Sequence, residues 1–374
     1  MTVGAVVAMA LAIALAAPAI AWAQRPDRAD CSTESVGLTP LTELGTDDYQ
    51  GTQGGLYPGG SNETPTDHLA LGLELASQVK PLDRDGSPHS NGLVGLLSIG
   101  VSNTRAEFDS FMQLAQSRLE VDPNVVLVNG ARNLADADIW ANDEEGIWDL
   151  LDRRVADAGL SPLQVQAAWI KVPERQERPE PFPAYAQVYA EKLEVVLQML
   201  TDRFPNVRLA YLSSRVYGGY GPQEHHNTEP FAYQQGFGVT WVIEDQILGE
   251  ADLNSDPSRG PIEAPWVAWG PYLWADGLRP RSDGLVWECA DFDSDGIHPS
   301  PIGSAKAASL LYDYLATSAT STSWFTRPGS GGPEPSSAPT NPTTTTTATT
   351  IEVAPSTTTL DERTSVTSAP PAAG

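Results

Sequence analysis

The chain of 374 residues contains few cysteines, few basic residues and few histidines. Its two cysteines, Cys31 and Cys289, are too few for a small fold held by several disulfides or for a four-cysteine metal site. Because 48 acidic residues stand against 22 basic ones, the formal net charge is −26, and a phosphate backbone would be repelled. We therefore expect no nucleic acid as a partner and attribute the acidity to solubility.

Long apolar runs are also scarce. Residues 1–23 form an uncharged run rich in Ala, Val, Leu and Ile, and it ends in Ala21-Trp22-Ala23 before Gln24. This small-x-small pattern predicts a secretory signal peptide that is removed on export. The run lacks a basic start, and an uncleaved membrane anchor is the alternative, because about 20 apolar residues can span a bilayer. We expect a secreted or cell-surface protein with no stable membrane insertion after cleavage.

Residues 327–374 contain few apolar side chains and are rich in Pro, Ser and Thr, with a threonine run at 343–347. Such a segment buries too little apolar area to offset the entropy of ordering, so we expect a disordered tail. The tail is either a stalk or spacer, with or without O-glycosylation, or a segment with no task of its own.

Cys31 and Cys289 both fall in the part of the chain that we expect to be exported, where an oxidising compartment permits one disulfide. A bond between them would tie the mature N-terminus to the segment just before Asp295. In the chain-entropy model, such a bond stabilises the fold by ~4–5 kcal/mol. The alternative is two free, buried thiols.

The remaining sequence divides into a loop-rich segment at 24–90, which we expect to pack on the main domain, and one large domain at 91–326. Apolar runs typical of buried strands alternate in this domain with segments of helical spacing. The strands are expected at 93–101, 124–129, 165–171 and 207–213, and the helices at 106–119, 148–158, 185–204, 240–248 and 303–315. The alternation predicts an α/β fold with a doubly wound parallel sheet flanked by helices.

Small or polar residues follow each predicted strand. Ser102, Gly130, Lys171 and Ser213 stand at the ends of the four apolar runs. Because open parallel sheets bind ligands outside the carboxyl ends of their strands, we expect the functional site at that edge.

Ser102 and the segment Asp295-Gly296-Ile297-His298 carry the chemistry of a serine hydrolase. A serine hydroxyl becomes a useful nucleophile when an adjacent base takes its proton. An aspartate can orient that base and stabilise its protonated form. We expect Ser102 as the nucleophile, His298 as the general base and then acid, and Asp295 as the orienting carboxylate. Ser102 or Asn103 can also be interpreted as the N-cap of a helix that begins near Arg105, and for Ser102 this role is compatible with that of nucleophile.

The segments Ile99-Gly100-Val101-Ser102-Asn103-Thr104 and Asp295-Gly296-Ile297-His298-Pro299-Ser300 resemble the SGNH (GDSL-like) hydrolases, and the resemblance covers residues 90–320. The sequence around them, including YLSSRVY and GPYLWADG, is similar to a bacterial secreted subgroup of that family. The resemblance implies a three-layer sandwich, a serine–histidine–aspartate mechanism, ester substrates and no cofactor.

The resemblance also implies an oxyanion hole with up to three donors. The first is the Ser102 backbone N–H. The second comes from a glycine-rich turn after the second strand, which here spans 129–133, with Gly130 present and Asn133 where a glycine is expected. Ser102, Gly130 and Asn133 are therefore the oxyanion candidates.

Two departures from the family pattern weigh against full activity. Val101 stands where the family has aspartate, and the segment 169–174 lacks the asparagine that supplies the third donor. The loss of one such donor removes ~3 kcal/mol of transition-state stabilisation. Arg132 or Lys171 is a candidate replacement.

Aromatic residues gather just before Asp276 and on a glycine-rich loop. Exposed rings can stack on sugars or line an acyl pocket, which makes Tyr57, Trp269, Tyr272 and Trp274 candidates for substrate binding. The alternative is core packing, because aromatic side chains bury much area.

We expect neither a metal nor a cofactor. His225 and His226 lack further ligands at a regular spacing. Residues 291–296 begin like a calcium loop, but the twelfth position is Ile302 and not an acidic residue.

These patterns predict a secreted, monomeric serine esterase that acts on a small-molecule ester or an acylated carbohydrate. The departures leave a second hypothesis open, a non-catalytic glycan-binding or surface module on a degenerate scaffold of the same type. A third hypothesis is a spacer protein that contacts partners through its Thr-rich tail.

Overall fold

The computed structural model describes residues 29–175, 180–222, 227–327 and 329. The predicted signal peptide lies outside the described residues, as do His225, His226 and the predicted tail apart from Arg327 and Gly329. All described residues belong to one structural unit.

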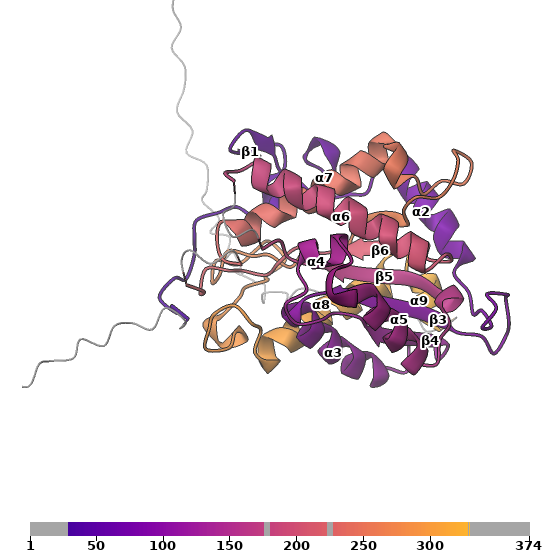
Figure 1. Cartoon of the computed structure of the whole chain (residues 1–374). Helices are drawn as coiled ribbons and strands as arrows, with labels where there is room; N and C mark the ends of the chain where they lie inside the picture. The colour runs from indigo at the N-terminus through magenta and orange to yellow at the C-terminus, as the bar shows by residue number, and fades with distance from the viewer. Residues whose placement is uncertain (1–28, 176–179, 223–226, 328, 330–374) are drawn as a thin grey trace, which may run out of the picture. The chain divides into compact units, whose positions relative to one another are not determined.

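Five parallel strands form the centre of the domain in the order β4-β3-β5-β6-β7 (Figure 1). Their register aligns pairs such as Leu96 with Leu127 and Ala168 with Ala210. The side chains are mostly apolar and largely buried, as expected for a parallel sheet that helices cover on both faces. The strands are β3 (Val94–Gly100), β4 (Val125–Asn129), β5 (Val165–Lys171), β6 (Leu209–Leu212) and β7 (Trp266–Trp269).

Helices lie on both sides of this sheet. Helices α6 and α7 pack against each other, as do α3 and α8, and Figure 1 shows α6 and α3 on opposite sides of the strands. The longer helices are α2 (Thr66–Gln78), α3 (Ser102–Gln116), α5 (Ile147–Asp157), α6 (Ala184–Arg203), α7 (Phe231–Leu248) and α8 (Pro301–Thr317). No helix in the described part of the chain is long and apolar enough to cross a membrane.

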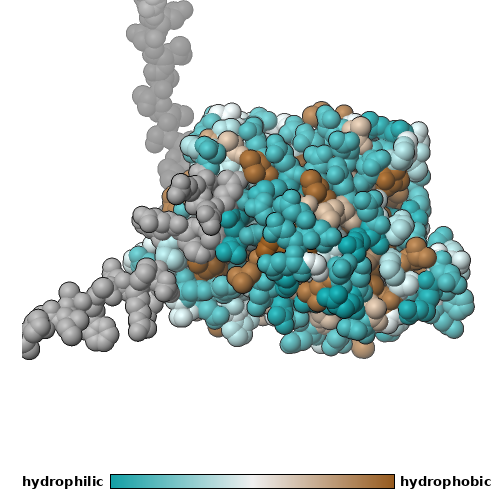
Figure 2. Space-filling model, in the orientation of Figure 1, coloured by the Kyte–Doolittle hydropathy of each residue, from teal (hydrophilic) through white to brown (hydrophobic). Residues whose placement is uncertain are grey.

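Short elements complete the fold. They are α1 (Leu41–Leu44), the antiparallel pair β1 (Asp48–Tyr49) and β2 (Thr52–Gln53), α4 (Ala137–Ala141) and α9 (Thr322–Phe325). The face of the molecule in Figure 2 is mainly hydrophilic, and apolar residues are scattered over it in small patches.

The α/β class and the parallel sheet that the sequence predicts are confirmed. The short elements were not predicted, and helix α7 begins at Phe231, nine residues earlier than expected. Two further differences are a strand of the central sheet and a long helix. Strand β7 is a fifth strand in a stretch whose aromatic residues suggested a binding surface, and α2 is a regular helix within the segment expected to be loop-rich. Helix α2 carries Gly72 on its buried side, where an added Cβ would lie 2.5 Å from the Trp266 ring, so the helix packs too closely for a larger residue.

The strand order places a topological switch point beside β3. The chain leaves β3 for β4 on one side and returns to β5 on the other, so the direction of winding reverses at the end of β3. Such a switch point is where open α/β sheets bind ligands. Ser102 is the second residue after this strand.

The N-terminal segment packs along the main domain through polar contacts. The Val36 N–H donates to Asp276 Oδ1 at 2.7 Å, and the Leu41 N–H donates to the Tyr272 hydroxyl at 3.1 Å. A disulfide joins Cys31 to Cys289, as the sequence predicts. The alternative of two free thiols is therefore wrong.

The aromatic candidates for substrate binding belong to the core. Tyr57, Trp269, Tyr272 and Trp274 are each no more than 6% exposed. Several of their polar atoms are used internally: the Tyr57 hydroxyl accepts from the Trp269 backbone N–H, and Trp274 Nε1 donates to Glu229. Because buried rings cannot stack on a ligand, the packing interpretation is right and the binding interpretation is wrong for all four.

Candidate active site

The turn from β3 to α3 positions Ser102. Gly100 ends the strand, and a Cβ at this position would lie 2.3 Å from the Lys171 carbonyl oxygen and 2.4 Å from Thr104 Oγ1. Glycine thus lets the start of α3 approach β5 closely. The helix begins at Ser102 itself, with the extended residue Val101 as its N-cap. The predicted cap role of Ser102 is therefore wrong, since the helix starts earlier than expected.

A tight loop before α8 holds Asp295 and His298. Gly296 lies in the left-handed region at φ +68°, which favours glycine. Asp295 Oδ1 accepts from the backbone N–H groups of Ile297 and His298 at 2.9 and 3.0 Å. Ser300 ends the loop as the N-cap of α8, with its hydroxyl accepting from two N–H groups of the first turn.

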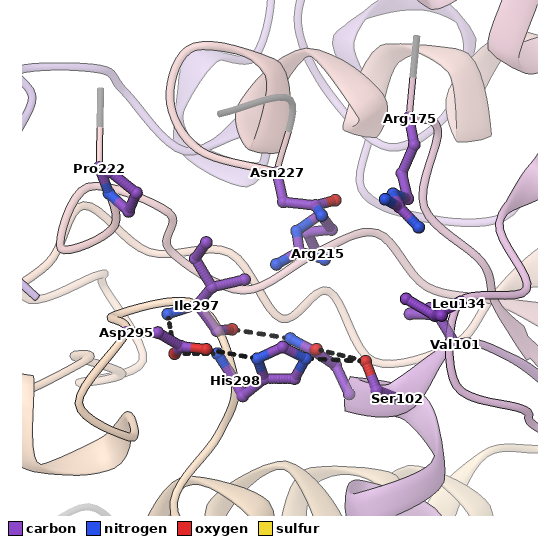
Figure 3. A pocket seen from close by; sticks show the side chains of 11 residues that line it. Val101, Ser102, Leu134, Arg175, Arg215, Pro222, Asn227, Asp295, Ile297 and His298 are labelled. Atoms are coloured by element: carbon purple, nitrogen blue, oxygen red, sulfur yellow. Dashed lines mark hydrogen bonds and ion pairs between the residues drawn. The ribbon is translucent and has the colours of Figure 1, made fainter. Parts of the chain in front are cut away.

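The structure brings Ser102, His298 and Asp295 together in one line of hydrogen bonds (Figure 3). Asp295 Oδ2 lies 2.6 Å from His298 Nδ1, and His298 Nε2 lies 2.9 Å from Ser102 Oγ. Because an ionised carboxylate only accepts, Nδ1 carries the imidazole proton and Nε2 is left to accept the serine proton. This is the arrangement in which an imidazole can act as base toward a hydroxyl.

Electrostatics keeps Asp295 ionised. Burial opposes its charge, but the hydrogen bonds from His298 and Ile297 outweigh burial and lower the pKa of the carboxyl below its usual value. The carboxylate is thus available to orient the imidazole at neutral pH.

Asn103 is a residue of this site that sequence reasoning misses. Its side chain is buried, and Nδ2 donates to the Ile297 carbonyl oxygen at 2.8 Å. The bond joins the first turn of α3 to the loop of His298, so it fixes the distance between the serine and the imidazole. A lone asparagine beside a serine has no spacing that would identify it in advance.

The three residues open into a cavity of about 270 Å³. Figure 3 shows its walls, which come from the ends of β3 and β6, the loop after β4 and the loop before α8. The lining residues are Val101, Ser102, Asn103, Leu134, Arg175, Arg215, Pro222, Asn227, Asp295, Ile297 and His298.

The three oxyanion candidates differ in their position relative to the cavity. Ser102 lies at the N-terminus of α3, where free N–H groups and the helix dipole favour a negative charge. Gly130 is packed against the Ser98 carbonyl oxygen, and Asn133 is exposed. Neither lines the cavity, and Leu134 occupies the wall on that side instead. That Gly130 and Asn133 contribute donors stays a prediction, and the cavity lining does not include them.

The two replacement donors are also engaged elsewhere. Lys171 is buried, and its Nζ lies 2.5 and 2.6 Å from the carboxylate oxygens of Glu107. Burial lowers the pKa of Lys171, and the Glu107 carboxylate acts in the opposite direction. Arg132 forms an ion pair with Glu145 and does not line the cavity.

Within the described ranges, no group of three or more His, Cys, Asp or Glu residues is placed to hold a metal ion. His225 and His226 lie outside those ranges.

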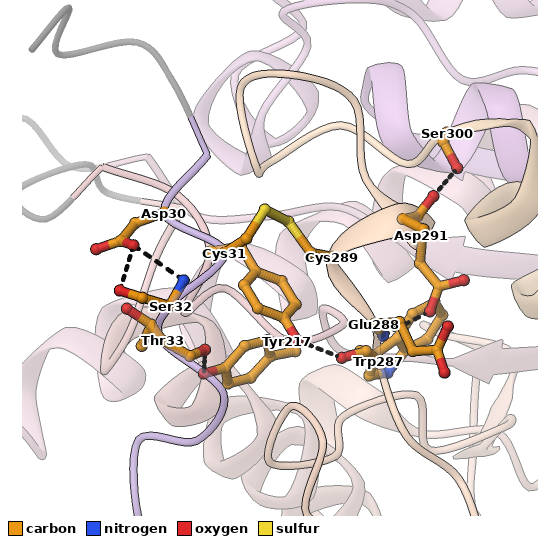
Figure 4. The surroundings of a disulfide bond; sticks show 12 residues. Asp30, Cys31, Ser32, Thr33, Tyr217, Trp287, Glu288, Cys289, Asp291 and Ser300 are labelled. Carbon is orange, nitrogen blue, oxygen red and sulfur yellow. Dashed lines mark hydrogen bonds between the residues drawn. A yellow bond between two sulfur atoms is a disulfide. The ribbon is translucent and has the colours of Figure 1, made fainter.

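The disulfide joins Cys31 to Cys289, which lies six residues before Asp295, and Figure 4 shows its surroundings. Next to Cys31, the Ala29 N–H donates to the Ser294 carbonyl oxygen at 2.8 Å, and the Asp30 N–H donates to Tyr220 O at 2.8 Å. The N-terminal segment therefore supports the loop one residue before Asp295.

Comparison with known proteins adds little to this description. No family model and no curated protein matches the sequence. Among solved structures, an Arabidopsis thaliana protein is similar to this chain with 14% sequence identity over 55% of this chain and 67% of that one, at a TM-score of 0.30. We draw no inference from a likeness at this level.

Proposed function

We propose that the protein is a serine ester hydrolase of the SGNH type. The observation that carries this proposal is the hydrogen-bonded line from Ser102 Oγ through His298 to Asp295, which opens into a cavity at the switch point of the sheet. The 2.9 Å between Ser102 Oγ and His298 Nε2 is within the reach that proton transfer requires.

In the first half of the reaction, Ser102 Oγ attacks the acyl carbon while His298 Nε2 takes its proton. Asp295 stabilises the resulting imidazolium. The negative charge on the former carbonyl oxygen develops beside the N-terminus of α3, where the Ser102 N–H is the nearest preorganised donor. The imidazolium then protonates the leaving alcohol, and the acyl group stays on Ser102.

In the second half, a water molecule takes the place of the alcohol. His298 Nε2 removes its proton as it attacks the acyl carbon, and the same proton returns to Ser102 Oγ as the carboxylic acid leaves. The enzyme is restored without any change of oxidation state, so the chemistry requires no cofactor.

The substrate in this proposal is a small ester that reaches a compact cavity. An acylated carbohydrate belongs to this class, although the aromatic residues that suggested a sugar are buried. We propose that the enzyme is exported, because the disulfide suits an oxidising compartment. We also propose that it acts as a monomer.

A non-catalytic binding module is the second candidate. It is favoured by the cavity wall, where Leu134 stands and where neither Gly130 nor Asn133 contributes. A binding module has no need of the hydroxyl, so ligand affinity would persist in Ser102→Ala.

The test is hydrolysis of p-nitrophenyl acetate and butyrate by the full chain, beside Ser102→Ala and His298→Ala. We expect turnover in the wild type and its loss in both variants, with unchanged thermal unfolding. Turnover that survives in Ser102→Ala would refute the serine mechanism. A glycan that binds equally to wild type and Ser102→Ala, with no ester turned over, would favour the binding module.

A further inference from the structure

Arg215 is a charged side chain of the cavity that the proposed mechanism does not use. It follows the carboxyl end of β6, and only 4% of its surface is exposed. It lines the cavity together with Ser102 and His298. Figure 3 shows it across the cavity from these two residues, beside Asn227.

Within the described ranges, this guanidinium forms no ion pair with an acidic side chain. Among the described residues, no Asp or Glu forms an ion pair with Arg215, and its Nε–H donates to nothing. Glu107 and Glu229 are the carboxylates whose charges act on it. Glu107 is bound by Lys171, and Glu229 accepts from Trp274 and two backbone N–H groups. Neither is free to neutralise Arg215.

A buried and unpaired cation is unfavourable, because it has lost its hydration without gaining a partner. Arginine does not escape this cost by losing its proton. Its planar fork of donors matches the two oxygens of a carboxylate. A carboxylate that enters the cavity would therefore supply the ion-pair partner that the described residues do not.

The other guanidinium of the cavity differs in this respect. Arg175 is about a quarter exposed, at 27% for its side chain, and its Nε lies 3.9 Å from Asp136 Oδ2. Its charge is thus shared with an acidic residue and with solvent. Arg215 is the more buried of the two cations, and it lines the same cavity as Ser102 and His298.

We propose that Arg215 binds a carboxylate of the substrate, so that the preferred ester carries a negative charge close to the bond that is cleaved. That the ligand is an ester rests on the proposed function. The anion site itself rests on the burial and the missing partner of Arg215.

A binding experiment tests the anion site without turnover. Benzoate and its neutral analogue benzamide are titrated by calorimetry into full-length Ser102→Ala, with and without Arg215→Gln. We expect benzoate to bind more tightly than benzamide, and Arg215→Gln to weaken benzoate about 10- to 100-fold, the weight of one charge-assisted hydrogen bond. Equal binding of benzoate and benzamide to the protein with Arg215 intact would overturn the proposal.

The controls separate charge from folding. Arg84→Gln removes a guanidinium that donates to the Gly159 carbonyl oxygen on the surface, and it should leave benzoate binding unchanged. Arg215→Lys keeps the positive charge but lacks the planar guanidinium donors, so it should retain part of the affinity for benzoate. If Arg215→Gln fails to fold, the comparison of benzoate with benzamide and the Arg215→Lys variant still decide the matter.

A turnover experiment tests the link to the ester. 4-Acetoxybenzoate and its methyl ester differ in one negative charge. We expect Arg215→Gln to lower kcat/KM for 4-acetoxybenzoate about 10- to 100-fold and to leave the methyl ester nearly unchanged. An equal loss for both esters would overturn the proposal, because Arg215 would then act on the reacting carbonyl. If neither ester is hydrolysed while benzoate binding still depends on Arg215, the proposed hydrolase function fails and the anion site stands.

Discussion

One side chain ties the turn that carries Ser102 to the loop that carries His298. Asn103 Nδ2 holds the Ile297 carbonyl oxygen at 2.8 Å, and no other bond of the described residues joins the side chains of the first α3 turn to the backbone of that loop. We infer that Asn103 is a positioning residue, which acts through the loop that carries His298.

We predict that Asn103→Ala lowers kcat about tenfold with little effect on KM, the equivalent of one hydrogen bond of about 1.4 kcal/mol. The reason is that the imidazole no longer meets Ser102 Oγ at a fixed distance. Steady-state kinetics on p-nitrophenyl butyrate measures both constants. Asn142→Ala removes a similar bond, to the Asp138 carbonyl oxygen, and neither residue lines the cavity. It is the matched control and should leave kcat unchanged.

The carboxyl of Asp295 makes stability depend on pH. Its pKa is lowered in the folded protein, because the hydrogen bonds from His298 and Ile297 outweigh burial. An unfolded aspartate has a pKa of about 3.9. The stabilisation is therefore complete above about pH 4 and is lost as the pH falls through the lower folded pKa.

We predict that acidification lowers the free energy of unfolding of the wild type more than that of Asp295→Asn, so that the two values converge. Urea unfolding between about pH 6 and pH 3 measures the difference, with Asp293→Asn as a control on the same loop. A gap that stays constant over this range would contradict the prediction.

Spacing decides which of these residues could be predicted from the sequence. Asp295 and His298 lie three residues apart on one loop, and Ser102 directly follows an apolar run that predicts a strand. The residues that carry the chemistry therefore stand in a pattern that the sequence reveals. Asn103 and Arg215 carry no such pattern. Their roles follow from which chain segments the fold brings next to them, and a single sequence does not contain that information.

The contact between helix α3 and strand β5 contains a buried ion pair. Glu107 and Lys171 are 1% and 3% exposed, and they lie beneath the turn that presents Ser102. Removing one partner of a buried pair leaves an uncompensated charge, whereas replacing both with apolar groups often costs little.

We predict that Glu107→Leu and Lys171→Met each lower the free energy of unfolding by about 3–5 kcal/mol, and that the double variant loses much less than their sum. Urea denaturation of the four proteins forms a double-mutant cycle. Additive losses would show that the pair contributes nothing beyond its separate side chains.

Strands and helices with strong periodicity could be predicted, and the structure confirms most of them with shifts of up to four residues at their ends. Helix α7 is the exception, because it begins at Phe231, nine residues before the predicted start at 240. Strand β7 differs because its Trp-Val-Ala-Trp sequence is short and gains its conformation from pairing with β6. Helix α2 differs because its apolar side is interrupted by Gly72, which the Trp266 ring requires. In both cases the tertiary partner, and not the local pattern, determines the element.

At the scale of the whole molecule, the Cys31–Cys289 bond closes a loop of 258 residues. We predict that the double variant Cys31→Ser/Cys289→Ser loses about 4–5 kcal/mol of stability, the loop entropy restored to the unfolded chain. Urea unfolding measures this loss. Adding dithiothreitol should destabilise the wild type by a similar amount and leave the double variant unchanged.

The long separation of these two cysteines also has a consequence for the time course of synthesis. At about 5–20 residues per second, Cys289 is made about 13–50 s after Cys31. During that interval the Cys31 thiol has no correct partner, because the chain offers only one. A nascent chain that enters an oxidising compartment therefore carries a thiol open to mixed disulfides with small thiols or other proteins. Its yield of native molecules should depend on how quickly such adducts are exchanged once Cys289 emerges.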